Sequence, residues 1–589
     1  MRPSPLIIAA LLATTGPAYA AATIERVDVR GLDNALMTQN INVNLSINNE
    51  TGKRLGESRL EFLLNEAQAE TREALEPFGY YSPEITVDAP RPGGDDERIT
   101  VTVTVVLGEP VRVRQSHLII EGEGNDDEYL QRDLGAFRPR IGEVLDHITY
   151  EASRNLVTRR LAERGYLDAD TTKRLVEVTR AEKAADIMVT WASGIRYDMG
   201  PVTFHQTQFN PGLLDKLVYW EQGSYFHQGK LDRLRESLVA LDYFSAIDIV
   251  PDPENAIGRE VPIDVQLTLA PRTIYTLGLS YGTDSGAGVR LGLERRYVNS
   301  RGHKLLAHLN YAETRKTFST IYRVPAFKWL DGWYTAALEA NDEQTDYIDI
   351  NNARLILSRS GVISEQWTVV ASLNALRERW RYGPDELGEY TDYEYSTLAY
   401  PEARGDYVNV DDRLFPRSGV SGNLTLRGGV EGAGSDASFT QMHLNARWFM
   451  APGDASRLLL RGEAGVTLTD ELVNMPPSLR YFAGGDRSIR GYAWREVGPR
   501  NADDFALGAK NVFSASVEYE HYLNGGPWGA AVFVDTGSAF DSTPDWHTGI
   551  GIGWVFPTDV TIPNAASVRF RLASGLTIEA LVRLGIDNE

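Results

Sequence analysis

Three short segments near the C-terminal end of this 589-residue chain carry charged side chains that together could build an ionic site. Arg490 lies in a glycine-rich stretch, 484–492, while Glu518 and Asp535 lie in two later stretches that alternate polar and apolar residues. A guanidinium group donates to two carboxylates at once, so an Arg490 that approaches both would form an ionic clamp. Such a clamp holds a loop in place and does no covalent chemistry.

The alternation around the two acidic residues predicts which way they point. Asp535 shares a strand face with Phe533 and Gly537, opposite Val532 and Val534. The face of Glu518 also holds Ser514, Ser516 and Glu520, opposite Phe513, Ala515, Val517 and Tyr519. A charge that faces lipid costs ~2–4 kcal/mol for a basic residue at the midplane and somewhat less for an acidic one, so both acids would face the interior of a membrane barrel. Two plainer interpretations stay open: a solvated loop charge for Arg490, and simple pore lining for the acids.

Catalytic and metal-binding patterns are not found in the sequence. The nine histidines are scattered without metal-ligand spacing, and the chain has no cysteine. There is no GxSxG, no HExxH and no phosphate-cradling glycine loop between a strand and a helix. Acidic pairs such as Asp126-Asp127 and Asp503-Asp504 are interpreted as solvated loop carboxylates. We therefore predict that the protein is not an enzyme and uses no metal or cofactor.

The elements that would position the clamp begin at Arg272. From there to Glu589, stretches of about 10–15 residues alternate apolar and polar side chains between clusters of turn residues. We count about 16 such segments, and their length favours an outer-membrane β-barrel over a soluble sandwich. Aromatic residues at segment ends are typical of membrane interfaces; they include Trp329, Trp333, Trp448, Phe449 and Trp554. The last segment is the most regular: Leu576, Ile578, Ala580, Val582, Leu584 and Ile586 share one face.

The first half of the chain contains a repeat. Helix-like segments lead into Tyr80, Tyr166 and Tyr243, and later β-type runs break at Gly108, Gly194 and Pro271. Both sets have the same two spacings, 86 and then 77 residues. We therefore predict an α+β module used three times. The helix residues expected to face each sheet are Leu60, Phe62 or Leu63, Ala67 and Leu75 in the first module; Leu156, Leu161 and Tyr166 in the second; and Leu231, Leu238, Leu241 and Phe244 in the third.

The N-terminus and the overall charge indicate where the chain works. Met1 and Arg2 precede an apolar stretch, 6–13, and the segment ends in a small-residue site, Ala18-x-Ala20, which predicts a secretory signal peptide at residues 1–20. No later run of ~18 apolar residues predicts a transmembrane helix. The net charge of −22 argues against a nucleic-acid binder. The predicted divisions are 1–20 (signal), 21–110, 111–196 and 197–271 (repeats), and 272–589 (barrel).

These features together resemble the BamA/TamA superfamily of POTRA-barrel assembly factors and two-partner secretion pores. The repeats resemble POTRA domains, although the third has Asp242 where the others have glycine. The lumen-loop motif [V/I]-R-G-[F/Y] of the family is matched by Ile489, Arg490, Gly491 and Tyr492. The strand motif F-x-D-x-G is matched by Phe533, Asp535 and Gly537, and the strand-twelve acid by Glu518. The motifs occur in order behind three repeats, and the resemblance covers essentially all of the chain after residue 20.

The resemblance implies three α+β POTRA-like repeats in the periplasm, followed by a 16-stranded antiparallel β-barrel in the outer membrane. It implies capture of client chains on a POTRA sheet edge by β-augmentation, then transfer to a barrel seam that can open. The seam residues would be Thr273 and Tyr275 of the first strand with Leu576, Ile578, Ala580, Val582 and Leu584 of the last. Implied partners are unfolded outer-membrane or autotransporter chains, outer-membrane lipid and an inner-membrane-anchored TamB-like protein. The alternative is a two-partner-type pore for one exported substrate.

Overall fold

A computed structural model gives the architecture. It describes residues 22–90, 97–282, 285–327, 330–345, 348–383, 391–485, 487–501, 505–523, 528–555, 560–562, 566–573 and 575–586. The predicted signal peptide, residues 1–20, lies outside these ranges. Among the described residues, no helix is both long enough and apolar enough to cross a membrane.

The first module is a four-stranded sheet covered by helices, with strand order β2-β1-β4-β3. Its elements are β1 (Ala22–Arg30), α1 (Ala35–Asn44), β2 (Arg54–Leu55), α2 (Glu57–Leu75), β3 (Glu84–Asp88) and β4 (Glu97–Val106). Helix α2 buries Leu60, Leu63, Ala67 and Leu75, which recur at helical spacing, against the sheet. Phe62 is 52% exposed, so Leu63 takes the core position that the sequence left open between them.

The second module is a three-stranded sheet, order β5-β7-β6, packed on one long helix. Its elements are β5 (Arg112–Glu121), α3 (Glu128–Gly135), α4 (His147–Glu163), β6 (Asp170–Thr179) and β7 (Ala184–Ala192). Helix α4 buries Tyr150, Val157 and Leu161. The prediction for Leu156 was wrong, because Val157 occupies the sheet-facing position and turns its neighbour toward solvent.

The third module has strand order β8-β10-β9. Its elements are β8 (Asp198–His205), α5 (Gln228–Leu241), β9 (Phe244–Pro251) and β10 (Glu260–Leu269). Asp242 ends α5 with a φ of +54°, the left-handed conformation that Gly79 and Gly165 adopt at the corresponding places. Aspartate tolerates this conformation better than most residues, so the departure from glycine preserves the backbone geometry. Its carboxylate accepts from Arg296 Nε at 3.0 Å.

Residues 202–219, 232–250 and 264–589 belong to one compact unit, in which the end of the third module meets the base of the barrel. Tyr243 is fully buried and donates its hydroxyl hydrogen bond to the backbone oxygen of Gly302. Its ring stacks on Phe209 with 4.8 Å between the ring centroids. The buried tyrosine thus ties the last module to the first turn on the module side of the barrel.

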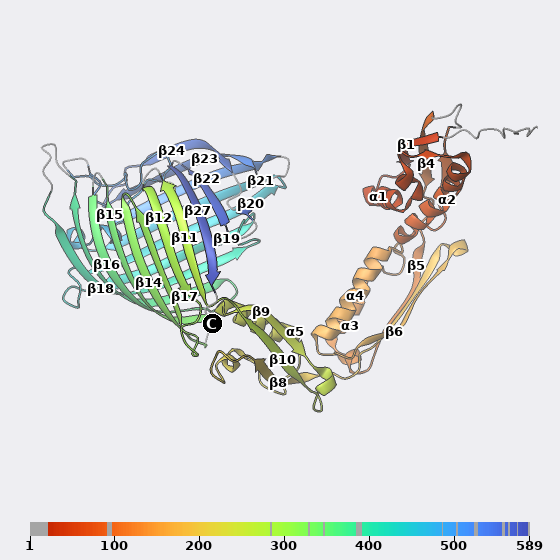
Figure 1. Cartoon of the computed structure of the whole chain (residues 1–589), viewed down its shortest axis with the longest axis horizontal. Helices are drawn as coiled ribbons and strands as arrows, with labels where there is room; N and C mark the ends of the chain where they lie inside the picture. Colours follow the sequence, from red (N-terminus) through yellow and green to blue (C-terminus); the bar gives the residue numbers. More distant parts are fainter. Residues whose placement is uncertain are drawn as a thin grey trace, which may run out of the picture. The chain divides into compact units, whose positions relative to one another are not determined.

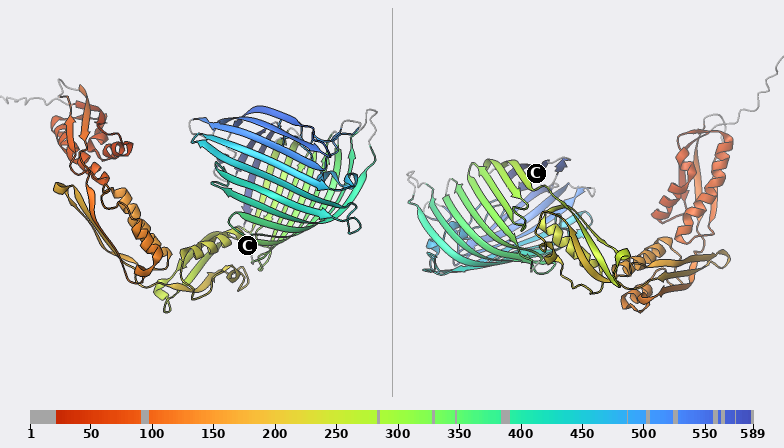
Figure 2. Two further views of the ribbon diagram at one scale, coloured as in Figure 1. Left: turned by 180° about the vertical axis from the view of Figure 1, so that it is seen from behind. Right: turned by 60° about the horizontal axis from the view of Figure 1, so that its bottom comes forward.

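The rest of the chain forms a closed antiparallel barrel (Figures 1 and 2). Its strands are β11 (Thr273–Gly282), β12 (Gly286–Arg295), β13 (Lys304–Ala312), β14 (Arg315–Pro325), β15 (Leu330–Gln344), β16 (Ile348–Val362), β17 (Trp367–Tyr382), β18 (Glu394–Val410), β19 (Gly419–Gly429), β20 (Phe439–Gly453), β21 (Ser456–Leu468), β22 (Asn511–Tyr522), β23 (Gly529–Phe540), β24 (His547–Val555), β25 (Val560–Ile562), β26 (Ala566–Ala573) and β27 (Gly575–Ile586). Over the described ranges this makes seventeen strand segments where about sixteen were expected. The difference is β25, a three-residue segment that pairs with β26.

The strands alternate between an inner and an outer face, as their sequences predict. On β23, Val532 and Val534 are half exposed on the outside, whereas Asp535, the next residue along the strand, has no exposed surface. Of the aromatic residues expected at strand ends, Trp448 and Trp554 are exposed, and Trp329 lies outside the described residues. Trp333 and Phe449 are buried, because both stand at inward positions of their strands and not on the outer surface.

Candidate functional site

A long insert, Glu471–Lys510, connects β21 to β22, the eleventh and twelfth strands of the barrel. It contains Ile489, Arg490, Gly491 and Tyr492, and it folds back against the inner faces of β22, β23 and β24. Ile489 is fully buried in an apolar cluster with Val512 of β22 and Ala539 of β23. Tyr492 packs edge-on against His547 of β24. The insert is therefore seated by apolar contacts on both sides of its arginine.

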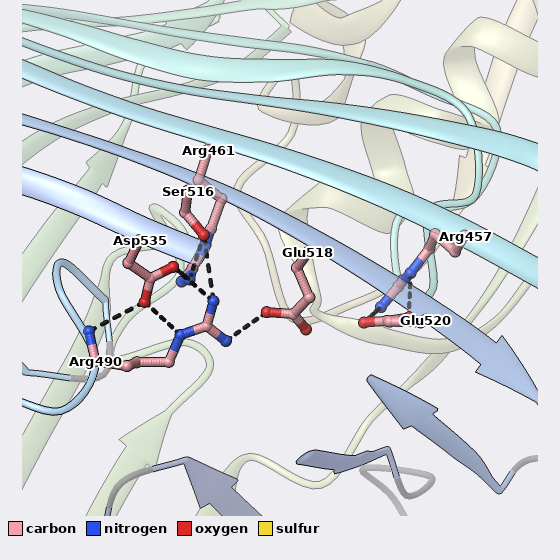
Figure 3. A network of polar contacts seen from close by, with 7 residues as sticks. All are labelled: Arg457, Arg461, Arg490, Ser516, Glu518, Glu520 and Asp535. Atoms are coloured by element: carbon pink, nitrogen blue, oxygen red, sulfur yellow. Dashed lines mark hydrogen bonds and ion pairs between the residues drawn. The ribbon is translucent and has the colours of Figure 1, made fainter. Parts of the chain in front are cut away.

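Arg490, Glu518 and Asp535 meet at the centre of this seat (Figure 3). Arg490 Nε donates to Asp535 Oδ2 at 2.6 Å and Nη2 donates to Asp535 Oδ1 at 2.7 Å, a two-pronged contact. Nη1 donates to Glu518, and the backbone N–H of Arg490 donates to Asp535 Oδ2 at 3.0 Å. The side chain of Arg490 is 8% exposed and that of Asp535 is fully buried. We call these three residues the clamp.

Three further residues surround the clamp: Ser516 and Phe533, which the sequence placed on the inward faces, and Arg461, which it did not indicate. Ser516 Oγ accepts from Arg490 Nη2 at 3.2 Å and from Arg461 Nη2 at 3.0 Å (Figure 3). Arg461 also lies 3.7 Å from Asp535. The ring of Phe533 lies under the Arg490 guanidinium, with its centroid 3.4 Å from Cζ, which is a cation–π contact. The inward alternation of β21 was the signal that could have found Arg461, since a basic residue is costly on the lipid face.

The backbone of β24 leaves room for the arginine. At Gly549, which is directly opposite Asp535 in the β23–β24 register, a Cβ atom would lie 1.9 Å from the backbone oxygen of Arg490. Any side chain at this position would therefore displace the insert. Glycine at 549 is required by close approach of two backbones, a role that no sequence motif indicated.

The polar groups of this site pair with one another. A buried arginine with two carboxylates and a serine hydroxyl has its donors and acceptors matched, so it fixes one backbone against another. Within the described ranges there is no group of three or more histidine, aspartate or glutamate side chains placed to hold a metal ion. The contacts of Arg490 join the insert to the inner faces of β22 and β23.

The predicted seam residues lie at the junction of the first and last strands. β11 pairs with β27 without interruption, from Thr273 opposite Ile586 to Gly282 opposite Thr577. Within this register Tyr275 is opposite Leu584, and Val582, Ala580 and Ile578 face Leu277, Leu279 and Tyr281. Leu576 pairs with Leu572 of β26 instead of with β11. Tyr275 and the next outward residues of β11 are exposed, while Thr273 is buried.

Residues 298–557 match the Omp85 superfamily domain, and residues 26–105 match the POTRA domain described as TamA domain 1. The outer membrane protein assembly factor BamA of Neisseria meningitidis serogroup B (strain ATCC BAA-335 / MC58) is 22% identical over 498 residues, 76% of this chain and 59% of that protein. BamA of Buchnera aphidicola subsp. Acyrthosiphon pisum (strain APS) is 20% identical over 341 residues, which cover 56% of this chain and 53% of that protein. The chain thus spans just over half the length of these curated relatives.

A solved structure shares the fold. The crystal structure of BamA from Haemophilus ducreyi lacking POTRA domains 1–3 superposes with a TM-score of 0.63 at 14% identity, covering 80% of this chain and all of that one. These matches place the protein in the outer membrane, with its POTRA part in the periplasm.

Proposed function

Because the chain carries an Omp85 superfamily domain behind a POTRA domain, we propose that it assembles or translocates other outer-membrane proteins, as a factor of the TamA type. In this proposal residues 21–110, 111–196 and 197–271 are three POTRA modules, and 272–589 is the barrel. Client chains of the autotransporter kind are captured in the periplasm and released beside the barrel. An inner-membrane-anchored TamB-like protein is the proposed partner.

The observation that carries the proposal is the combination of a fully paired seam with an insert held inside the barrel. A passive pore needs neither periplasmic modules nor a long loop fixed to its inner wall. An unfolded client that cannot use the occupied lumen has the seam between β11 and β27 as its other route into the membrane. This ten-residue pairing includes none of the clamp residues, so in this proposal the seam opens while the clamp stays closed.

We propose that β6 is the strand edge that captures clients. β6 is an edge of the second sheet, ten residues long, and most of its residues are exposed. The opposite edge is partly occupied: the N–H of Val113 in β5 donates to the oxygen of Glu143, and its oxygen accepts from the N–H of Gly142. Main-chain pairing along β6 would bind extended clients with little dependence on their sequence.

A reconstituted system tests the proposed function. The purified full chain in liposomes is mixed with an unfolded barrel protein, and membrane insertion of that client is followed by protease protection. We expect faster insertion than in empty liposomes, and crosslinking of the client to a photoreactive group at Leu175 of β6 but not at Ile148, an exposed residue of α4. Equal insertion rates with and without the protein would contradict the assembly function. If one exported substrate crosses into the liposome interior and no barrel protein is inserted into the membrane, the dedicated secretion pore is favoured.

A further inference from the structure

The insert contacts the barrel wall at a second place, five strands away from β22. The N–H of Ser478 in the insert donates to Glu378 Oε1 of β17 at 3.1 Å. Glu378 Oε2 accepts from Asn352 Nδ2 of β16, also at 3.1 Å. Glu378 is fully buried. Its carboxylate therefore has one oxygen bound to the insert and the other to the wall.

Apolar side chains surround this carboxylate contact. Met475 and Leu479, on either side of Ser478, are buried against Leu376 of β17 and Leu398 of β18. Tyr400 and Phe439 belong to the same cluster. Gln441 Nε2 of β20 donates to the oxygen of Leu479 at 2.9 Å, so the backbone on the far side of Ser478 is also held. Glu378 itself has no exposed surface, which makes its hydrogen bonds costly to lose.

The returning part of the insert joins the same region of the wall. Phe505 and Leu507 pack against Ile348 and Trp380 in a separate apolar cluster. Arg480 ties the two parts together: Nη1 donates to the oxygen of Leu507 at 2.9 Å and Nε donates to the oxygen of Met475 at 2.8 Å. Nη1 also donates to the hydroxyl of Tyr382 on β17 at 3.2 Å.

We propose that Glu378 is a second anchor of the insert, separate from the Arg490 clamp. In this proposal the clamp holds the tip of the insert to β22 and β23, and Glu378 is the buried charged contact among those that hold its base to β16, β17 and β20. The two share no residue, so either one opens while the other stays closed. Glu378 acts as a positioning residue that keeps the lumen occupied when the clamp is released.

Hydrogen exchange of the folded full chain in detergent micelles tests this independence. The base peptide is 471–482 and the tip peptide is 487–498. Glu378→Leu removes both acceptor oxygens at similar volume, and we expect exchange in the base peptide to rise about tenfold, equivalent to ~1.4 kcal/mol, with the tip peptide unchanged. Arg490→Ala should give the reverse pattern. Heat-modifiable gel mobility verifies that each barrel has folded.

Two further variants keep the result decisive. Glu339→Gln is the matched control, because Glu339 is a carboxylate of the same wall that binds Arg354 of the neighbouring strand, and both peptides should stay as in the wild type. Leu479→Ala weakens the base from the insert side, without altering a barrel strand, and should raise exchange in the base peptide alone. An unchanged base peptide in Glu378→Leu and Leu479→Ala, or release of both peptides by either one, would overturn the proposal.

A second measurement separates anchoring from general stability. In planar bilayers we expect low ion conductance for Arg490→Ala and for Glu378→Leu singly, and a several-fold higher conductance for the double variant. If Arg490→Ala alone conducts as much as the double variant, Glu378 does not hold the insert.

Discussion

Replacement of Arg490 by alanine should release the tip of the insert from the barrel wall. The variant loses two hydrogen bonds to Asp535, at 2.6 and 2.7 Å, and the contacts with Glu518 and Ser516. It leaves the fully buried carboxylate of Asp535 without its main partner. Removing one member of a buried ion pair costs ~3–5 kcal/mol. Arg461, 3.7 Å from Asp535, partly compensates, so we expect the lower end of this range.

The assay is hydrogen exchange of the tip peptide, 487–498, in the folded full chain. A loss of ~3 kcal/mol corresponds to an increase in exchange on the order of a hundredfold. Arg490→Lys keeps the charge but loses the planar guanidinium that binds two oxygens at once. Exchange of its tip peptide should therefore lie between that of Arg490→Ala and that of the wild type. Arg490→Met combined with Asp535→Leu removes the two most buried charges of the clamp together and should recover part of the protection, because the charges that lose a partner, Glu518 and Arg461, are less buried than Asp535.

Two results would refute the reasoning. Tip exchange in Arg490→Ala within twofold of the wild type would show that the clamp does not hold the insert. The loss of tip protection in the double variant is compared, as a free energy, with the losses in the two single variants. If it equals their sum, the two residues act separately and the contact between them contributes no energy.

Three more predictions follow from single positions. Gly549→Ala should raise exchange of the tip peptide as Arg490→Ala does, because its Cβ would collide with the insert backbone, whereas Gly553→Ala on the same strand, with open space around it, should not. Burial raises the pKa of Tyr81 to about 12, so its contribution to stability is complete below pH 10 and is lost as pH rises from 10 to 12, by ~2–3 kcal/mol. Burial also raises the pKa of Tyr150 and Tyr166, so urea unfolding of Tyr81→Phe should show a smaller alkaline loss than the wild type, with the difference due to Tyr81. Tyr243→Phe removes the donor to Gly302, in the turn between β12 and β13, and should lower the free energy of unfolding by ~0.5–1.5 kcal/mol, visible as a lower urea midpoint.

The sequence was informative wherever a short period repeats. Alternation with a period of two placed Asp535 and Glu518 on inward faces, because one charged residue fixes the orientation of a whole strand. Equal spacings between helix-like and β-type landmarks indicated the repeated modules. Helical spacing alone could not choose between Phe62 and Leu63, or exclude Leu156, because adjacent residues differ by only 100° around a helix and the exact rotation depends on the sheet it covers.

The contacts of the insert could not be predicted in the same way. Its residues follow no period, and their partners are remote: Ser478 and Glu378 are 100 residues apart in sequence. Arg490 was identified through a motif, but Ser478 has no distinguishing neighbours. The collision at Gly549 likewise depends on the distance between two backbones, which composition does not encode.

The most direct test of the proposed function is the outer-membrane proteome of cells that lack this protein, compared with cells complemented by the wild type or by Arg490→Ala. If the protein assembles other barrels, several outer-membrane proteins should fall together on deletion, return with the wild type and return incompletely with Arg490→Ala. Loss of a single exported protein, with all barrel proteins at their normal levels, would contradict the assembly function and identify a dedicated secretion pore.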